Sequence, residues 1–284
     1  MSAWETLTPL LVYIQANLDQ DLGLAALGKR ANLSPAHLQR VFKAEIGETP
    51  KAYVTRLRVE RAAFCLLAHE SPVGEIAANC GFQNPETFIR AFRRRFGKPP
   101  SEYRSTVRSQ VAAWNDEHNE SLAGRHFEIS RTRLIDIRPT HLAFRRHVGP
   151  YEDVPESIFD ELERWATRRR LNGPRIWMGI GHDAPGATSP DKLRFDAALV
   201  VPGPFDPNGL IGYQLLPGGT HAVTTHAGPY ETLGDAYARI FPRLSTFNDY
   251  LPLGLPAVEV YHAARINVRF ALNHTDLCLP MRRK

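Results

Sequence analysis

Apolar residues recur at helical spacing through the first 108 residues or so, and the pattern changes to strand-like runs from about Phe127 onward. Short turns with Gly, Pro, Ser or Asn separate the helical sets, which are Leu10, Ile14 and Leu18, then Leu38, Val41, Phe42 and Ile46, then Phe88, Phe92 and Phe96. The strand-like runs are residues 140–144, 197–201, 222–225, 258–261 and 266–272. The stretch between the two patterns is polar. The sequence therefore predicts an all-α domain at 1–110, a linker at 111–125 and an α+β domain at 126–284.

The helical part contains an internal repeat. Three apolar positions from Leu27 to Leu33 match Ile76 to Phe82 at a shift of 49, and six positions from Leu38 to Tyr53 match Phe88 to Tyr103 at a shift of 50. Each copy has the layout of a short helix, a turn, a second helix and a Gly-x-x-Pro stop, and a longer helix over residues 51–69 joins the copies. Each second helix begins with a good N-cap followed by proline, Ser34-Pro35 and Asn84-Pro85. The layout predicts two helix-turn-helix units.

Charge adds a candidate partner for these units. The chain up to Gln110 holds 15 Lys and Arg against 10 Asp and Glu, whereas the remainder holds 20 of each. A basic excess confined to one domain is typical of a module that binds a polyanion. A plain helical bundle with a solvated basic face is the alternative.

The second helices carry unlike polar faces, which is what two base-reading helices need. Arg pairs with guanine and Gln with adenine, Ile89 suits a thymine methyl group, and Glu86 suits the amino group of cytosine. Ser34 and the helix N-termini suit phosphate contacts. The candidate DNA-binding residues are Ser34, Ala36, Gln39, Arg40, Lys43, Pro85, Glu86, Thr87, Arg90 and Arg93.

The stretches HLQRVFKAEIGETPKAYVTRLRVERA and IAANCGFQNPETFIRAFRRRFGKPPSEYR resemble the DNA-binding domain of AraC/XylS regulators, over about Leu7 to Arg108. The resemblance implies two helix-turn-helix units on a rigid connecting helix, which enter successive major grooves on one side of the DNA. It puts the base-reading positions at Ala36, Gln39, Arg40, Pro85, Glu86 and Arg90. Ala36 is small and Pro85 has no N–H, so this chain departs from the usual pattern there.

A second repeat lies in the strand-rich part. Residues 147–152 (HVGPYE) match residues 226–231 (HAGPYE) at a shift of 79. A strand-like run precedes each block and an amphipathic helix follows it, with Ile158, Phe159 and Leu162 in one copy and Ala236, Tyr237 and Ile240 in the other. The pattern predicts a duplicated domain.

This duplicated pattern resembles the GyrI-like effector-binding domain, from about Arg125 to the end of the chain. Further stretches that carry the likeness are residues 177–183 (WMGIGHD), 195–197 (FDA), 217–220 (PGGT) and 257–261 (AVEVY). The resemblance implies two β-α-β-β copies around a pocket, with helices outside. A DNA-binding domain placed first resembles the layout of right-origin-binding regulators.

Glu259 is the sharpest candidate for the effector site. It interrupts an apolar run, and a buried carboxylate requires a partner or a cationic ligand. The resemblance puts it at the pocket floor, although the outward face of an edge strand would also suit it. Tyr151 and Tyr230 either line the cleft or pack the turn, and Trp177 either forms an aromatic wall or belongs to the core. Asp196 and Tyr261 are further candidates, and such a pocket favours lipophilic cations.

Signatures of other classes are missing from the sequence. No run approaches the roughly 18 apolar residues of a membrane span, and no metal-ligand, P-loop, dinucleotide or G-x-S-x-G pattern appears. Three scattered cysteines suit no disulfide frame or zinc site, and the start MSAWETLTPL does not resemble a secretion signal, so we expect the cytoplasm. We expect no metal, no cofactor and no enzymatic activity.

Together these features predict a sequence-specific DNA-binding transcriptional regulator whose C-terminal domain binds a small-molecule effector. Its partners would be double-stranded promoter DNA, the effector and, if it is an activator, RNA polymerase. Two alternatives stay open: the GyrI-like domain docks a partner protein, or it is a pocket hydrolase with Glu259 as general base.

Overall fold

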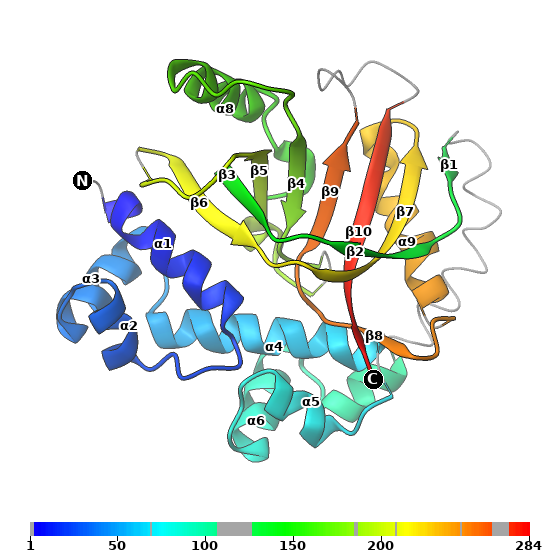
Figure 1. Cartoon of the computed structure of the whole chain (residues 1–284). Helices are drawn as coiled ribbons and strands as arrows, with labels where there is room; N and C mark the ends of the chain where they lie inside the picture. Colours follow the sequence, from blue (N-terminus) through cyan, green and yellow to red (C-terminus); the bar gives the residue numbers. More distant parts are fainter. Residues whose placement is uncertain are drawn as a thin grey trace. The chain divides into compact units, whose positions relative to one another are not determined.

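The computed structural model of the chain describes residues 3–68, 70–106, 127–184, 187–207, 209–244, 246–262 and 273–284. Its contacts form two units, residues 1–104 with 205–214 and residues 105–204 with 215–284. Figure 1 shows helices in the first unit, blue to cyan, and a curved sheet in the second, green to red. The expected fold class is confirmed. The predicted linker at 111–125 and the strand-like run at 266–272 lie outside the described residues.

Two helix-turn-helix units flank one long helix in the N-terminal part of the chain. The helices are α1 (Ala3–Ala16), α2 (Leu24–Arg30), α3 (Pro35–Ile46), α4 (Pro50–Ala68), α5 (Val73–Asn79) and α6 (Pro85–Phe96), and residues 100–106 are helical as well. The pairs α2–α3 and α5–α6 are the predicted units, and α4 is the predicted connecting helix.

The second helix of each unit begins and ends as the sequence predicts. The Ser34 side chain accepts a hydrogen bond from the His37 N–H at 3.3 Å, and the Asn84 side chain accepts two from the first turn of α6. Gly47 and Gly97 end α3 and α6 in the left-handed conformation, with φ of 81° and 74°. Both helices therefore have the same length and the same stops.

Each turn passes through one left-handed residue, Asn32 (φ 54°) in the first unit and Gly81 (φ 86°) in the second. Asn tolerates this conformation, but Gly81 has no space for any side chain. A Cβ there would collide with the carbonyl oxygen of Leu18 and lie 2.7 Å from the Nε of Arg58. The second turn uses glycine because it packs directly against Leu18, before α2, and against Arg58 of α4.

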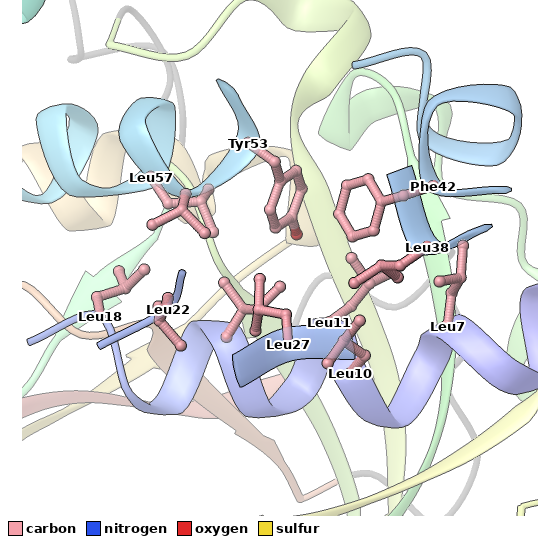
Figure 2. Close-up of a cluster of buried hydrophobic side chains, with 12 residues drawn as sticks. Leu7, Leu10, Leu11, Leu18, Leu22, Leu27, Leu38, Phe42, Tyr53 and Leu57 are labelled. Carbon is pink, nitrogen blue, oxygen red and sulfur yellow. The ribbon is translucent and has the colours of Figure 1, made fainter. Parts of the chain in front are cut away.

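Separate apolar cores stabilise the two helix-turn-helix units. Figure 2 shows the first, where side chains of α1, α2, α3 and the start of α4 converge, among them Leu10, Leu27, Phe42 and Tyr53. The second core holds apolar side chains of α4 from Val59 onward, together with those of α5 and α6. The border between the cores crosses α4 between Leu57 and Val59.

The strand-rich part of the chain, from β1 to β10, is built on one antiparallel sheet. Its elements are β1 (Glu128–Ile129), β2 (Arg133–Ile137), β3 (Thr140–Val148), α8 (Ser157–Arg168), β4 (Trp177–Gly181), β5 (Arg194–Val200), β6 (Ile211–Leu216), β7 (Gly219–Ala227), α9 (Leu233–Leu244), β8 (Tyr250–Pro252), β9 (Ala257–Tyr261) and β10 (His274–Arg283). The strand order is β1-β7-β10-β9-β4-β5-β3-β6, with β2 beside β7 and β8 beside β10.

The sheet register confirms the duplication. The copies are β3-α8-β4-β5 and β7-α9-β9-β10, and they meet where β4 pairs with β9. Arg146 pairs with Asp196 in the first copy, and the residues 79 and 80 positions further on, Thr225 and Asp276, pair in the second. The repeat seen in the sequence is therefore a repeat of strand pairing as well.

Both helices of the repeat cover the same face of the sheet. A row of directly paired residues runs along this face from Arg145 on β3 through Gly179 and Glu259 to Leu277 on β10. Glu161 of α8 pairs with Arg145 at 3.0 Å, and α9 packs on the apolar cluster that contains Leu277. This face places Glu259 under the two helices.

Candidate functional sites

The candidate DNA-reading surface consists of the outward faces of α3 and α6. All ten candidate residues are exposed: Ser34, Ala36, Gln39, Arg40, Lys43, Pro85, Glu86, Thr87, Arg90 and Arg93. The opposite faces are buried through Leu38 and Phe42 in α3 and through Phe88 and Phe92 in α6. Each helix is therefore held by its apolar side and free on its polar side. That these residues contact DNA remains a prediction.

Two further positions on α6 refine this surface. Ile89 is 41% exposed, which leaves an apolar side chain on the polar face. Arg95, one of three consecutive arginines, turns toward the connecting helix, where its guanidinium lies 3.6 Å from the carboxylate of Glu60. Arg93 and Arg94 are exposed. The basic run at the end of α6 thus divides between two exposed arginines and one that is partly buried against α4.

The second candidate site surrounds Glu259 on β9, whose side chain is buried. The hydroxyl of Tyr261 donates to one of its carboxylate oxygens at 2.6 Å, and the hydroxyl of Tyr237 on α9 donates to the other at 3.2 Å. In the described residues these neutral hydroxyls are its hydrogen-bond partners. Glu259 thus lies in the sheet interior, not on an edge strand.

Aromatic rings enclose this carboxylate. Phe159 of α8 packs edge-on against Trp177 and Tyr261, with ring centroids 5.9 Å and 6.0 Å apart. Tyr230 packs edge-on against Tyr261 at 5.5 Å. The Tyr230 hydroxyl is buried, and no described residue hydrogen-bonds to it. We call Glu259 and these rings, together with Tyr237, the acidic-aromatic cluster.

Burial sets the protonation chemistry of the cluster. It raises the pKa of Glu259, and the hydrogen bonds from Tyr261 and Tyr237 offset this only in part. Burial and the nearby Glu259 charge raise the pKa of Tyr230 to about 12, and they raise the pKa values of Tyr237 and Tyr261 well above the ordinary value. The cluster therefore offers one acid and several neutral hydroxyls.

Comparison with known proteins decides the class of both domains. Residues 130–282, more than half of the chain, match the GyrI-like small molecule binding domain. The chain belongs to the GyrI-like family. Residues 27–106 match a helix-turn-helix domain of the AraC type. The resemblances found in the sequence are thus confirmed, and the chain has the architecture of a DNA-binding transcriptional regulator with a GyrI-like domain.

Several proteins similar to this chain are regulators or DNA-binding proteins by name. The chain is 46% identical to a helix-turn-helix-type transcriptional regulator of Mycobacterium tuberculosis over 28% of this chain and 31% of that protein. It is 34% identical to the regulatory protein SoxS of Escherichia coli over 37% of this chain and 97% of SoxS. It is 36% identical to the right origin-binding protein of Escherichia coli over 34% of this chain and 33% of that protein. Two of these matches thus span about a third of the relative.

Tyr151 lies on the same face of the sheet as Glu259, next to Gly181, but its hydroxyl has other hydrogen-bond partners. Its hydroxyl donates to the backbone oxygen of Asp183 at 2.7 Å and accepts from the Asp183 N–H at 3.1 Å. Its ring packs edge-on against Phe195. Tyr230, the matching residue of the second copy, has no such partner among the described residues. The hydroxyl groups of the two matching tyrosines therefore differ in their hydrogen bonding.

Asp196 does not join the acidic-aromatic cluster, because it points to the opposite face of the sheet. Arg146 donates two hydrogen bonds to it at 2.6 Å and 2.7 Å, and His182 Nε2 lies 2.7 Å away. Burial alone would raise the pKa of Asp196, but Arg146 and His182 outweigh burial and hold it below the ordinary value. Its role as an effector contact remains a prediction, with a buried ion pair as its observed setting.

The second copy repeats this arrangement, which indicates a scaffold role for it. His262 and Asp276 stand 80 positions after His182 and Asp196, and their side chains are 2.8 Å apart. Thr225 takes the place of Arg146 and donates to Asp276 at 2.6 Å. A His–Asp pair that recurs in both halves of the duplicated sheet belongs to its architecture.

Sequence reasoning missed Tyr237 and Phe159 as members of the acidic-aromatic cluster, because both read as apolar positions of amphipathic helices. A signal was present, since the two helices follow the matching HxGPYE blocks and each helix carries an aromatic residue on its apolar face.

A cavity of about 620 Å³ lies elsewhere, beside Tyr13 and Arg30 of the helical unit. Charge and burial, not cavity size, single out Glu259.

Two kinds of feature are absent from the described part of the chain. No helix there is both long and apolar enough to span a bilayer. No group of three or more His, Cys, Asp or Glu side chains there is arranged to hold a metal ion. The described cysteines, Cys65, Cys80 and Cys278, are buried, and none of them is in a disulfide bond.

Proposed function

We propose that this chain is a sequence-specific regulator that binds promoter DNA through α3 and α6 and a lipophilic cation through its GyrI-like domain. The observation that carries the effector class is the buried Glu259, whose partners among the described residues are neutral hydroxyls. Buried charges in proteins normally have a partner of opposite sign. A cationic ligand would supply it, and the rings around Glu259 would add cation–π attraction.

The DNA part of the proposal rests on the two recognition helices. They share caps, length and burial pattern but differ in their outward residues, so each would read a different half-site in successive major grooves. The effector would alter DNA affinity only if it binds the two functional states of the chain unequally. RNA polymerase would be a further partner of an activator, and the cytoplasm is the place where such a regulator meets DNA.

The test begins with duplexes selected from a random library by the full-length chain. DNA affinity is then measured at two salt concentrations, with and without tetraphenylphosphonium. Site-preferring, steeply salt-dependent binding that this cation shifts would support the proposal, and triphenylphosphine oxide is the uncharged control. Weak binding that is equal on every duplex would contradict the DNA part.

The effector part has its own pair of variants. Glu259→Gln removes the charge at the cluster, whereas Asp276→Asn makes the same acid-to-amide change on the neighbouring strand β10, facing the other side of the sheet. Tetraphenylphosphonium should shift the tryptophan fluorescence and melting temperature of the parent chain and of Asp276→Asn, but not of Glu259→Gln. Equal shifts in all three would contradict a site at Glu259. Capture of a protein partner with no small-molecule effect would favour the docking alternative.

One observation favours a second candidate, a hydrolase activity of the GyrI-like domain. Burial raises the pKa of Glu259, as a general base requires. We propose sensing over turnover because the similar proteins are regulators. Hydrolysis of 4-nitrophenyl acetate by the parent chain that disappears in Glu259→Gln, but not in Asp276→Asn, would favour the enzyme.

A further inference from the structure

A continuous line of ion pairs crosses the helical unit. Glu48, in the turn after α3, accepts hydrogen bonds from Arg56 at 3.0 Å and 2.7 Å. Arg56 also donates to Glu60, one turn further along α4, at 3.1 Å. The other oxygen of Glu60 lies 3.6 Å from the guanidinium of Arg95 on α6. The line therefore begins at the end of one recognition helix and finishes on the other.

Glu60 is the central member, and its place is unusual. It lies just beyond the point on α4 where the first apolar core ends at Leu57 and the second begins at Val59. Its side chain is only 7% exposed, between Arg56 at 11% and Arg95 at 32%. Because the two cores are separate clusters, the relative placement of the two helix-turn-helix units depends on the shared helix α4 and on contacts of this kind.

A second contact supports the same junction from another side. The Arg58 guanidinium donates to the backbone oxygens of Leu18 and Gln20 at 2.7 Å and 2.6 Å, which ties the α1–α2 connection to α4. Gly81, in the turn of the second unit, packs against Leu18 and Arg58 so closely that a side chain would collide. The second unit is thus held at its turn by backbone packing and at its recognition helix by Glu60.

Energetics explain why an acid stands at this border. A buried ion pair adds little net stability compared with apolar packing, because both charges lose their hydration. Its directional contacts nevertheless favour one geometry, and the loss of one partner leaves the other charge buried. Glu60 therefore contributes more to the relative placement of the two units than to their cohesion.

We propose that Glu60 is a positioning residue that sets the separation and angle of α3 and α6, and thereby the half-site spacing that the chain accepts. The inference rests on the proposed DNA-binding function. Two inserted base pairs move the second half-site by about 7 Å and rotate it by about 70°. A rigid reader cannot follow this shift, whereas a reader with a loosened junction can.

The experiment compares the full-length chain with Glu60→Gln on a duplex selected by the parent chain and on the same duplex with two base pairs inserted between the half-sites. We expect the parent chain to lose about tenfold or more in affinity on insertion, and Glu60→Gln to lose less than about threefold. Glu102→Gln is the matched control, since it breaks the exposed Lys98–Glu102 pair of the same domain, and it should keep the parent ratio. Melting temperatures accompany every titration.

The outcomes separate the inference from the function on which it rests. If the parent chain shows no site-preferring binding, the proposed function fails and the inference fails with it. If the parent chain discriminates spacing and a folded Glu60→Gln discriminates equally, the inference alone is overturned. If Glu60→Gln does not fold, Glu48→Gln breaks the same line at the end next to α3, and an unchanged spacing ratio in that variant overturns the inference. A lower melting temperature with an unchanged ratio would mean a stabilising role only.

Discussion

Gly179 and Glu259 pair directly across β4 and β9, and they occupy the same position in the two copies of the repeat. The duplicated fold therefore provides two equivalent positions at the centre of the sheet. One carries a carboxylate, and the other has no side chain. A second carboxylate here would repel the first. Glycine instead leaves room for the hydroxyl of Tyr261 and the ring of Phe195, which would collide with a Cβ at position 179.

Gly179→Ala should disturb the acidic-aromatic cluster without adding a charge. The new methyl group would displace the Tyr261 hydroxyl from its 2.6 Å contact with Glu259, and overpacking of this kind costs about 1–3 kcal/mol. We expect a melting temperature several degrees lower and weaker tetraphenylphosphonium binding. Gly203→Ala is the matched control, because nothing lies within 4 Å of its added Cβ. Equal behaviour of the two variants would show that the space above Gly179 is not critical.

Cation affinity should depend on pH through Glu259. Burial raises the pKa of this carboxyl, so the site loses its negative charge at a higher pH than an ordinary glutamate would. Affinity for tetraphenylphosphonium should therefore fall as the pH is lowered, starting at a higher pH than an ordinary glutamate would give, and Glu259→Gln should bind weakly at every pH. The folded chain holds this proton more tightly than the unfolded one, so Glu259 contributes less to stability as the pH rises. A flat affinity profile for the parent chain would contradict the assignment.

The helical domain could be predicted almost fully from the sequence because its signals are local. The N-caps Ser34 and Asn84 and the stops Gly47 and Gly97 act within one turn of their helices, and each does what its residue type predicts. The junction between the units could not be predicted. Glu60 meets its partners only after α4 and α6 pack, and its position in the sequence resembles that of any solvated helix residue.

Alternation along one strand predicts which of its residues share a face, but it does not predict which residues of different strands share that face. Phe195 and Asp196 are neighbours in the chain, but they point to opposite faces, and only strand pairing decides which face Glu259 shares. The sequence grouped Asp196 with Glu259 because both are acids within strands. The match of His182 with His262 is present in the sequence at a shift of 80 positions. It can be recognised only after the strand register of the repeat is known, because the HxGPYE blocks match at a shift of 79.

Asp196→Asn should destabilise the GyrI-like domain strongly. The substitution leaves Arg146, with a side chain 3% exposed, buried without its carboxylate, and such losses cost about 3–5 kcal/mol. Glu161→Gln is the matched control: it breaks the half-exposed pair with Arg145 on the same strand and should cost no more than about 1 kcal/mol. Thermal unfolding of the full chain measures both. The folded Asp196→Asn should still bind tetraphenylphosphonium, and loss of binding would restore Asp196 as an effector contact.

Base-reading and phosphate-contacting residues should separate in DNA titrations. Arg40→Ala and Arg90→Ala should each weaken binding to the selected duplex by about 1–3 kcal/mol and relax the preference at one base pair. Lys43→Ala should weaken specific and non-specific binding alike and reduce the salt slope by about one. Arg138→Ala, an exposed arginine of the strand-rich unit, is the control. If Arg40 or Arg90 can be replaced without loss of affinity or preference, the outward face assigned to that helix is wrong.

Acid should destabilise the GyrI-like domain through His226. Burial, with a smaller contribution from His274, lowers the pKa of this histidine from 6.5 to about 4. Between these values the unfolded chain takes up a proton that the folded chain rejects, so stability is lost as the pH falls through this window. His226→Gln removes that proton uptake. It also loses the 2.8 Å contact with Thr232, so the informative quantity is the slope of melting temperature against pH.

The slope should become shallower in His226→Gln but not vanish, because burial lowers the pKa of His182 as well. His147→Gln, the same substitution at the matching position of the first copy, is the control for the side-chain change itself. Melting temperatures at intervals from about pH 7 to about pH 4 give the comparison. A slope in His226→Gln that is as steep as in the parent chain would contradict the assignment to His226.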